Sequence, residues 1–333
     1  MDVERRMLLA GGAALLASGA GPVAAQTAPP ATGGPLPPGP AQPSETIDLW
    51  PAGAPGMPAR PPLEVVEDRS SDPVFRDRSA QGIAVPRLAV FRPERPNGAA
   101  VLLMPGGGYR YVVVDKEGYE LARWLTPRGF TAFVLFYRLP GDGWAAGPDV
   151  ALSDAQRAMR LIRHRHAEYG IDPERVAAMG FSAGGHLCAD LGTRFDHRAY
   201  EPVDEADALS ARPHDVAPIY PVVSMTPGVA HAGSRDLLLG PNPSAELEAR
   251  HSPDRNVPAN APPFFLLHAE DDGSVPVENT LLMRAALKAS GIPVETHLYH
   301  EGGHGFGLRQ TIGKPVELWP ELWLAWAKAA GLA

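Results

Sequence analysis

The chain has 333 residues, of which 44% are hydrophobic and 20% are charged, and its net charge is −8. These proportions exclude a wholly disordered chain and a membrane protein with many spans. The acidic balance disfavours nucleic-acid binding, which requires clustered lysines and arginines. Cys188 is the single cysteine, so neither an intrachain disulfide nor a cysteine-ligated zinc or iron–sulfur centre can form.

The first 25 residues have the layout of an export signal. Arg5 and Arg6 precede an uncharged stretch rich in alanine, glycine and leucine over residues 7–20, and small residues follow at 23–25. This layout predicts a cleaved signal peptide, and the paired arginines favour the twin-arginine route. A general secretory signal and a retained N-terminal anchor are the alternatives. We expect a periplasmic or extracellular protein with no stable membrane span after processing.

Residues 26–45 predict a disordered linker. The stretch 26–44 contains seven prolines, three glycines and no charged residue, so it cannot bury enough apolar surface to offset the entropy lost on ordering. The folded part is expected to begin near Thr46 and to form one domain over residues 46–333.

Short apolar runs alternate with longer segments of helical periodicity along this domain. The predicted strands are 85–91, 99–104, 130–137, 175–180, 217–223, 264–269 and 294–299. The predicted helices are 119–125, 149–167, 183–191, 278–290 and 316–330. This alternation predicts an α/β fold with a mostly parallel central sheet, flanked by helices on both faces. Ligands of such sheets bind at the carboxyl ends of the strands.

Three consecutive glycines, 106–108, follow the predicted strand 99–104. Glycine lets backbone N–H groups approach a developing negative charge without interference from a Cβ atom. We therefore predict Gly107 and Gly108 as two donors of an oxyanion hole. A phosphate loop is the alternative, but neither Gly-Lys-Ser/Thr nor Gly-x-Gly-x-x-Gly is present, so no nucleotide cofactor is expected.

The sequence Gly180-Phe181-Ser182-Ala183-Gly184 matches Gly-x-Ser-x-Gly between a predicted strand and a predicted helix. The serine of this pattern occupies a sharp strand-to-helix turn, where larger residues two positions away would collide. Ser182 is therefore the candidate nucleophile, and the N–H of Ala183 is the third candidate oxyanion donor. The alternative is a glycine-rich turn with an incidental serine.

A polar segment, residues 193–213, follows the predicted helix 183–191. Its acidic residues are Asp196, Asp204, Glu205 and Asp207. It forms either a cap over the pocket or a surface connection, and the sequence favours neither.

Three consecutive acids follow the predicted strand 264–269. In hydrolases with Gly-x-Ser-x-Gly, the acid comes after the serine and before the histidine. The residues after Asp272, Gly-Ser-Val-Pro, match the turn that commonly follows the catalytic acid. We therefore predict Asp272 as the acid, with Asp271 as the main alternative and Glu270 third. Each of the three can instead cap the following helix.

His304 lies in the late loop Gly302-Gly303-His304-Gly305-Phe306, whose glycines let the imidazole extend over the sheet edge toward Ser182. It is the predicted base, with His300 as the competitor. His186 and His268 are predicted to be packed, hydrogen-bonded groups. No metal-ligand pattern such as His-Glu-x-x-His occurs, so no metal is expected.

With these residues assembled, the chain looks like a serine α/β-hydrolase, and a finer set of motifs is more specific. It resembles bacterial acetylxylan esterase-like hydrolases, including the bifunctional feruloyl/acetylxylan esterase type. The motifs are, in chain order, 105–109, 115–118, 133–140, 180–187, 220–223 and 302–308. The resemblance covers roughly residues 46–330. It implies an α/β-hydrolase fold and an enzyme that releases short acyl groups from plant polysaccharides or related esters.

The predicted activity is that of a secreted serine carboxylesterase. It hydrolyses short acyl esters, with acetyl esters of xylan-type or other carbohydrate most favoured, through Ser182, His304 and Asp272 and an acyl-enzyme, without metal or cofactor. Tyr109, Tyr111 and Trp144 are candidates to stack on a sugar or feruloyl ring, with core packing as the alternative.

Three other activities stay open at this point. A generic short-chain esterase needs the same residues. A serine peptidase of the prolyl-oligopeptidase type shares the motif order but usually carries a large propeller domain, for which the chain leaves no room. A non-catalytic binding protein on a hydrolase scaffold is disfavoured by the intact Ser/Asp/His set.

Overall fold

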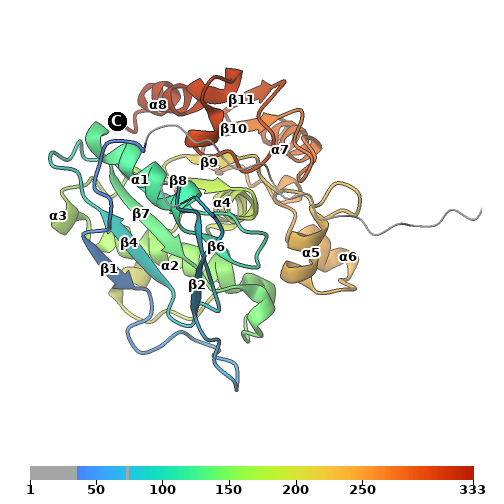
Figure 1. The fold of residues 1–333 in the computed structure, drawn as a ribbon. Coiled ribbons are helices and arrows are strands. Elements are labelled where there is room, and N and C mark those ends of the chain that lie inside the picture. The colour runs from blue at the N-terminus through green and yellow to red at the C-terminus, as the bar shows by residue number, and fades with distance from the viewer. Residues whose placement is uncertain (1–35, 73–74) are drawn as a thin grey trace, which may run out of the picture. The chain divides into compact units, whose positions relative to one another are not determined.

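The computed structural model of the chain describes residues 36–72 and 75–333. The predicted signal peptide and the first part of the predicted linker lie outside these residues. Within them, eight strands form one sheet in the order β1-β4-β7-β5-β8-β9-β10-β11, and a second sheet has the order β2-β3-β6 (Figure 1). From β7 to β11 the neighbours of the large sheet run parallel, while β1 and β4 complete one edge with antiparallel pairing.

The bounds of the strands and helices are as follows. The strands are β1 Glu45–Asp48, β2 Val65–Asp68, β3 Arg78–Gln81, β4 Arg87–Phe91, β5 Ala100–Met104, β6 Val112–Val113, β7 Thr131–Phe136, β8 Val176–Phe181, β9 Val216–Ile219, β10 Phe264–Ala269 and β11 Val294–Tyr299. The α-helices are α1 Glu120–Leu125, α2 Val150–His164, α3 His166–Tyr169, α4 Ala183–Arg194, α5 Ala232–Leu239, α6 Ala245–Arg250, α7 Glu278–Ala289 and α8 Trp319–Ala329.

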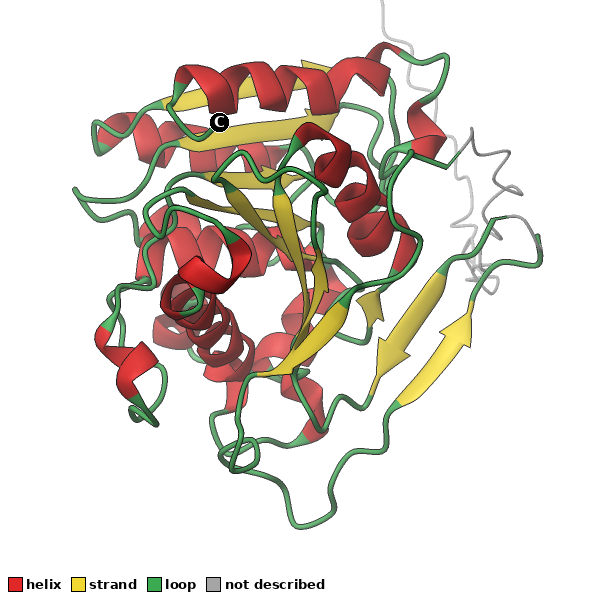
Figure 2. Ribbon diagram, turned by 90° about the vertical axis from the view of Figure 1, so that its left-hand side faces the viewer, coloured by secondary structure: helices red, strands yellow, loops and turns green. Residues whose placement is uncertain are grey.

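The predicted mostly parallel sheet with flanking helices is confirmed (Figure 2). All seven predicted strands and all five predicted helices are present. The helix predicted over 149–167 is interrupted at Arg165 and forms α2 and α3, and two further elements differ clearly in their limits. Strand β9 ends at Ile219 because Tyr220 takes a positive φ of 37° that turns the chain away. Helix α8 begins only at Trp319, because a 3₁₀ turn at Pro315–Leu318 precedes it.

The elements that the prediction missed lack a strong hydrophobic pattern. Strand β2 is exposed along its whole length, and β6 has only two residues. Pairing with β3 creates both strands, and that pairing depends on residues far apart in the chain. In Figure 2 the hairpin of β2 and β3 stands apart from the central sheet.

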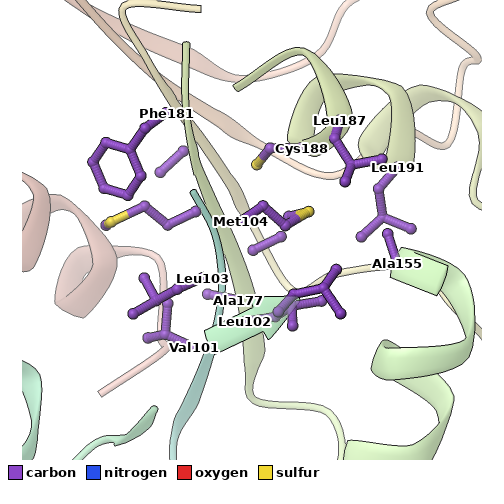
Figure 3. Close-up of a cluster of buried hydrophobic side chains, with 14 of the residues drawn as sticks. Val101, Leu102, Leu103, Met104, Ala155, Ala177, Phe181, Leu187, Cys188 and Leu191 are labelled. Atoms are coloured by element: carbon purple, nitrogen blue, oxygen red, sulfur yellow. The ribbon is translucent and has the colours of Figure 1, made fainter. Parts of the chain in front are cut away.

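The central strands are buried on both faces, as the apolar runs predict. Side chains of β5 alternate between the two faces, with Val101 and Leu103 on the side of Phe181 and Leu102 on the side of α4 (Figure 3). Helices α2 and α4 both pack on the face of the sheet to which Leu102 points. On the other face, the ring of Trp319 in α8 lies 6.2 Å from that of Phe181. Helices thus cover both faces of the sheet next to the carboxyl ends of β5 and β8.

Residues 36–45, which the composition assigned to a disordered linker, belong to the folded structure. Arg123 donates a hydrogen bond of 3.0 Å to the carbonyl of Pro37, and the N–H of Ser44 donates one of 2.8 Å to the carbonyl of Val90. Strand β1 then begins at Glu45. The predicted boundary near Thr46 is corrected, because backbone hydrogen bonds stabilise a segment that buries few side chains of its own. No helix in the described ranges is both long and apolar enough to cross a membrane.

Candidate active site

Ser182 occupies the turn between β8 and α4, with φ 54° and ψ −118°. Positive φ is strained for a residue with a Cβ atom, and such strain is characteristic of functional sites. A Cβ atom at Gly180 would lie 2.1 Å from the carbonyl oxygen of Gly184, and one at Gly184 would lie 2.1 Å from that of Met104. The two glycines of Gly-x-Ser-x-Gly are therefore required by the close approach of backbone on both sides of the serine.

The structure brings the side chains of Ser182, His304 and Asp272 together. His304 Nε2 lies 2.8 Å from Ser182 Oγ, and His304 Nδ1 lies 2.6 Å from Asp272 Oδ2. A carboxylate only accepts hydrogen bonds, so Nδ1 carries the imidazole proton and Nε2 accepts from the serine hydroxyl. This tautomer makes the imidazole a base directed at the hydroxyl.

The carboxylate of Asp272 is held on both oxygens. Oδ1 accepts from the backbone N–H groups of Ser274 (2.8 Å) and Val275 (2.9 Å), and Oδ2 also lies 3.1 Å from His268 Nε2. Burial raises the pKa of Asp272, but hydrogen bonds from His268 and His304 outweigh it and leave the pKa well below the usual value. The acid therefore stays ionised. His268 is a buried, hydrogen-bonded group as predicted, but its contact with Asp272 was not foreseen.

The competing residues have other places. Asp271 Oδ1 accepts from the N–H groups of Gly302 (2.9 Å) and Gly303 (2.7 Å), so this acid supports the loop that carries His304. Glu270 and His300 are exposed. Among the three acids, Asp272 is the one whose carboxylate contacts His304.

The glycine loop after β5 is held in place by buried side chains. The Tyr137 hydroxyl donates to the carbonyl of Pro105 at 2.7 Å, and the Tyr109 hydroxyl lies 2.7 Å from His186 Nδ1. Tyr109 has a positive φ of 60° and is 1% exposed, so it is a core residue and not a stacking surface. Burial lowers the pKa of His186 to about 4, which keeps it neutral.

Glu117, for which the sequence predicted no role in the active site, connects this loop to the surroundings of His304. The side chain is buried, and its two oxygens accept from the N–H of Gly106 (2.8 Å) and the hydroxyl of Tyr220 (2.9 Å). The ring of Tyr220 lies 5.1 Å from the imidazole of His304. One carboxylate thus orients both the loop and the ring that packs on the base.

A cavity of about 420 Å³ opens over Ser182 and His304. Gly107 and Gly108 line it, and neither donates its backbone N–H to an acceptor in the described part of the chain. With the N–H of Ala183, which begins α4, these groups are free to bind a negatively charged oxygen near Ser182 Oγ.

Part of the cavity wall comes from a segment for which the sequence predicted no role. His231, Gly233 and Leu237, at the start of α5 and within it, line the cavity, whereas no residue of 193–213 does. That segment packs on α2, where Arg157 pairs with Asp207 at 3.0 Å. Residues 193–213 are therefore a surface connection and not a cap.

Of the three candidate stacking aromatics, Tyr111 lines the cavity, and Trp144 is buried with 3% exposed. Across the described ranges, no group of three or more His, Cys, Asp and Glu side chains is arranged to hold a metal ion.

Comparison with known proteins shows that the chain is similar to esterases. Residues 88–287 match the BD-FAE family model. The chain is 38% identical over 205 residues to endo-1,4-beta-xylanase B of Butyrivibrio fibrisolvens, covering 62% of this chain and 32% of that protein. It is 32% identical over 226 residues to the acetylxylan esterase of Xylanibacter ruminicola, covering 66% and 44%. The chain spans less than half the length of each of these curated relatives.

A solved structure is similar over nearly its whole length. The acetyl ester-xyloside bifunctional hydrolase from Caldicellulosiruptor lactoaceticus is 35% identical, with a TM-score of 0.70, and the alignment covers 89% of this chain and 98% of that one. The predicted resemblance to acetylxylan esterase-like hydrolases and the α/β-hydrolase fold are thereby confirmed.

Proposed function

The chain belongs to the BD-FAE family, and from that premise we propose that it is a serine carboxylesterase that removes short acyl groups, acetyl above all, from acylated carbohydrate. The observation that carries the proposal is the hydrogen-bonded series Ser182–His304–Asp272 beside the free N–H groups of the glycine loop. The relatives named above are esterases and a xylanase, so the serine-peptidase alternative is not favoured.

The chemistry follows from the positions of the protons. His304 Nε2 takes the proton of Ser182 as Oγ attacks the ester carbonyl, and the N–H groups of Gly107, Gly108 and Ala183 bind the resulting oxyanion. Each such donor typically contributes about 2.7–4 kcal/mol to the transition state. His304 then gives the proton to the departing alcohol, which leaves an acyl-enzyme. Water, deprotonated by His304, releases the acid and restores the serine.

Short acyl groups are favoured by the lining of the cavity. Most of the lining side chains are polar or charged, with Val113 and Leu237 as the aliphatic ones. A long acyl chain would need an extended apolar surface, since each buried methylene contributes about 0.8 kcal/mol.

With 4-nitrophenyl esters of increasing chain length, we expect kcat/KM to peak between acetyl and butyryl. Acetate should also be released from acetylated xylan, and prolyl aryl amides should be left intact. A maximum at eight carbons or more without acetate release would reject the carbohydrate substrate and retain only a general esterase. Cleavage of the amides would restore the peptidase alternative.

We further propose that the protein is exported, on the basis of the N-terminal pattern. Mass spectrometry of periplasmic material is expected to show a mature chain that begins near Gln26. Replacement of Arg5 and Arg6 by lysine should block export if the twin-arginine route is used. Unchanged export of that variant would indicate the general secretory route, and an uncleaved chain in the membrane fraction would indicate an N-terminal anchor.

A further inference from the structure

The ionised side chains around the cavity are unequally distributed in sign. The chain as a whole has a net charge of −8, yet Arg69, Arg110 and Lys116 all line the cavity. The one carboxylate among the lining residues, that of Glu117, already accepts hydrogen bonds on both oxygens. The lining thus has three cationic side chains and one carboxylate, an excess of positive charge in a protein that is acidic as a whole.

Lys116 lies against the loop that carries the base. It belongs to a π-helical turn, Asp115–Tyr119, and is half-buried. Its stem packs over the loop of His304: a Cβ atom at Gly307 would lie 2.8 Å from Lys116 Cγ, and one at Gly305 would lie 3.6 Å from Nζ. No carboxylate in the described ranges lies within ion-pair distance of its ammonium group. Its ammonium group is therefore available to a negatively charged ligand, although Glu117 Oε1 is also nearby, 3.8 Å from the same Cβ position at Gly305.

Arg110 is the second free cation. It follows the glycine loop directly, and its backbone N–H donates to the carbonyl of Gly107 at 3.0 Å. The side chain is exposed at the rim and forms no ion pair within the described residues. Arg69 differs, because it pairs with Asp77 at 2.6 Å and donates to the Tyr111 hydroxyl at 2.9 Å. Lys116 and Arg110 are thus the two lining cations without an ion-pair partner in the described ranges. The carboxylate of Glu117 offsets part of their charge, because the groups that donate hydrogen bonds to it are uncharged.

His231 adds a neutral donor to the same wall. Its Nδ1 accepts from the backbone N–H of Ser234 at 3.1 Å, as the cap of α5. Burial, and then the neighbouring His304, lower the pKa of His231, so the ring is neutral and its proton is on Nε2. The cavity therefore offers hydrogen-bond donors to a ligand, whereas the carboxylates of Glu117 and Asp272 already accept hydrogen bonds from Tyr220 and His304.

We propose that the cavity selects esters whose alcohol portion carries a carboxylate, such as an acylated sugar that bears or adjoins a uronic acid, and that Lys116 binds this carboxylate with Arg110 assisting at the rim. The inference rests on the proposed esterase function. The acyl carbonyl must face Gly107 and Gly108, whereas the departing alcohol must lie beside His304, which protonates it. Lys116 lies next to the loop that carries His304, so its ammonium group is placed to bind a carboxylate on the alcohol portion of the ester.

Matched aryl esters test the inference. The probes are 4-acetoxybenzoate, its methyl ester as the neutral equivalent, and the methyl ester of 4-(succinyloxy)benzoate, which carries its carboxylate on the acyl side. For wild type and Lys116→Gln, we would measure the ratio of kcat/KM for each charged ester to that for the neutral one. We expect the ratio for 4-acetoxybenzoate to fall about tenfold in Lys116→Gln, the size typical of one partly screened charge pair. In the wild type that ratio should fall as salt is added.

Lys288→Gln is the matched control, because Lys288 is an exposed lysine of α7 outside the cavity lining. It makes the same change in net charge, so its ratio should equal that of the wild type. Lys116→Arg keeps the charge and should keep most of the preference. If Lys116→Gln does not fold, Arg110→Gln gives the same comparison with a smaller expected fall.

The outcomes separate the inference from the proposed function. Hydrolysis of the neutral ester with an unchanged ratio in Lys116→Gln would overturn the inference and leave the esterase standing. A larger Lys116-dependent preference for the succinyl ester would overturn the assignment to the alcohol side. Failure of the wild type to hydrolyse any of the three esters would instead overturn the proposed function. A final comparison of acetylated methyl glucuronoside with acetylated methyl glucoside should show the same Lys116-dependent preference for the uronic acid.

Discussion

Ser182→Ala is expected to abolish ester hydrolysis, with kcat lower by roughly 10⁴–10⁶-fold. The reason is that Ser182 Oγ is the atom hydrogen-bonded to His304 Nε2 at 2.8 Å, and alanine removes only this oxygen. The strained turn is imposed by the backbone around Gly180 and Gly184, which the substitution leaves unchanged. Turnover of 4-nitrophenyl acetate measures the loss, and circular dichroism with thermal melting measures the fold.

Ser210→Ala is the matched control, since Ser210 is an exposed serine outside the cavity lining. It should keep wild-type turnover. Substantial turnover by a folded Ser182→Ala protein would reject Ser182 as the nucleophile. A variant that loses both turnover and its melting transition would show instead that the serine is needed for folding.

Asp272→Asn is expected to lower kcat by about 10⁴-fold, whereas Asp271→Asn should lower it far less. Asp272 Oδ2 accepts from His304 Nδ1, and an amide at that place can donate instead, which favours the wrong tautomer of the imidazole. Within the described residues, Asp271 accepts from the N–H groups of Gly302 and Gly303 and not from His304. The oxygen of an asparagine amide can still accept from both. Values of kcat for the two variants, measured under the same conditions, make the comparison.

Equal losses in the two variants, or a larger loss for Asp271→Asn, would show that Asp271 is the catalytic acid.

The pH dependence of stability offers an independent check. Because the pKa of Asp272 is lowered in the folded protein, its contribution to stability is present above the unfolded value of about 3.9 and is lost as the pH falls toward the folded value. Asp272→Asn should therefore be less sensitive to acid over that interval than Asp271→Asn.

Much of the fold could be predicted because its signals are local. The strands of the sheet centre are buried on both faces, so their continuous apolar runs are visible in the sequence. Strands β1, β2, β3 and β6 were missed, and β2 shows why: it is exposed and is created by pairing with β3. The docking of residues 36–45 was missed for the same reason, since it depends on hydrogen bonds to Arg123 and Val90 and not on composition.

By itself, the sequence determined the mostly parallel sheet, the strand-to-helix turn at Ser182 and the glycine loops at 106–108 and 302–305, because each depends on steric limits within a few residues. For the acid, the sequence favoured Asp272 among three adjacent residues, and the tertiary structure showed that its carboxylate contacts His304, which depends on the path of a loop 32 residues away. Only the tertiary structure decided that Glu117 joins Gly106 to Tyr220, which is 103 residues beyond Glu117, and that Lys116 and His231 line the cavity. The physical reason is that ion-pair and hydrogen-bond partners are determined by distance in space. A local sequence pattern does not indicate which distant segment will complete the site.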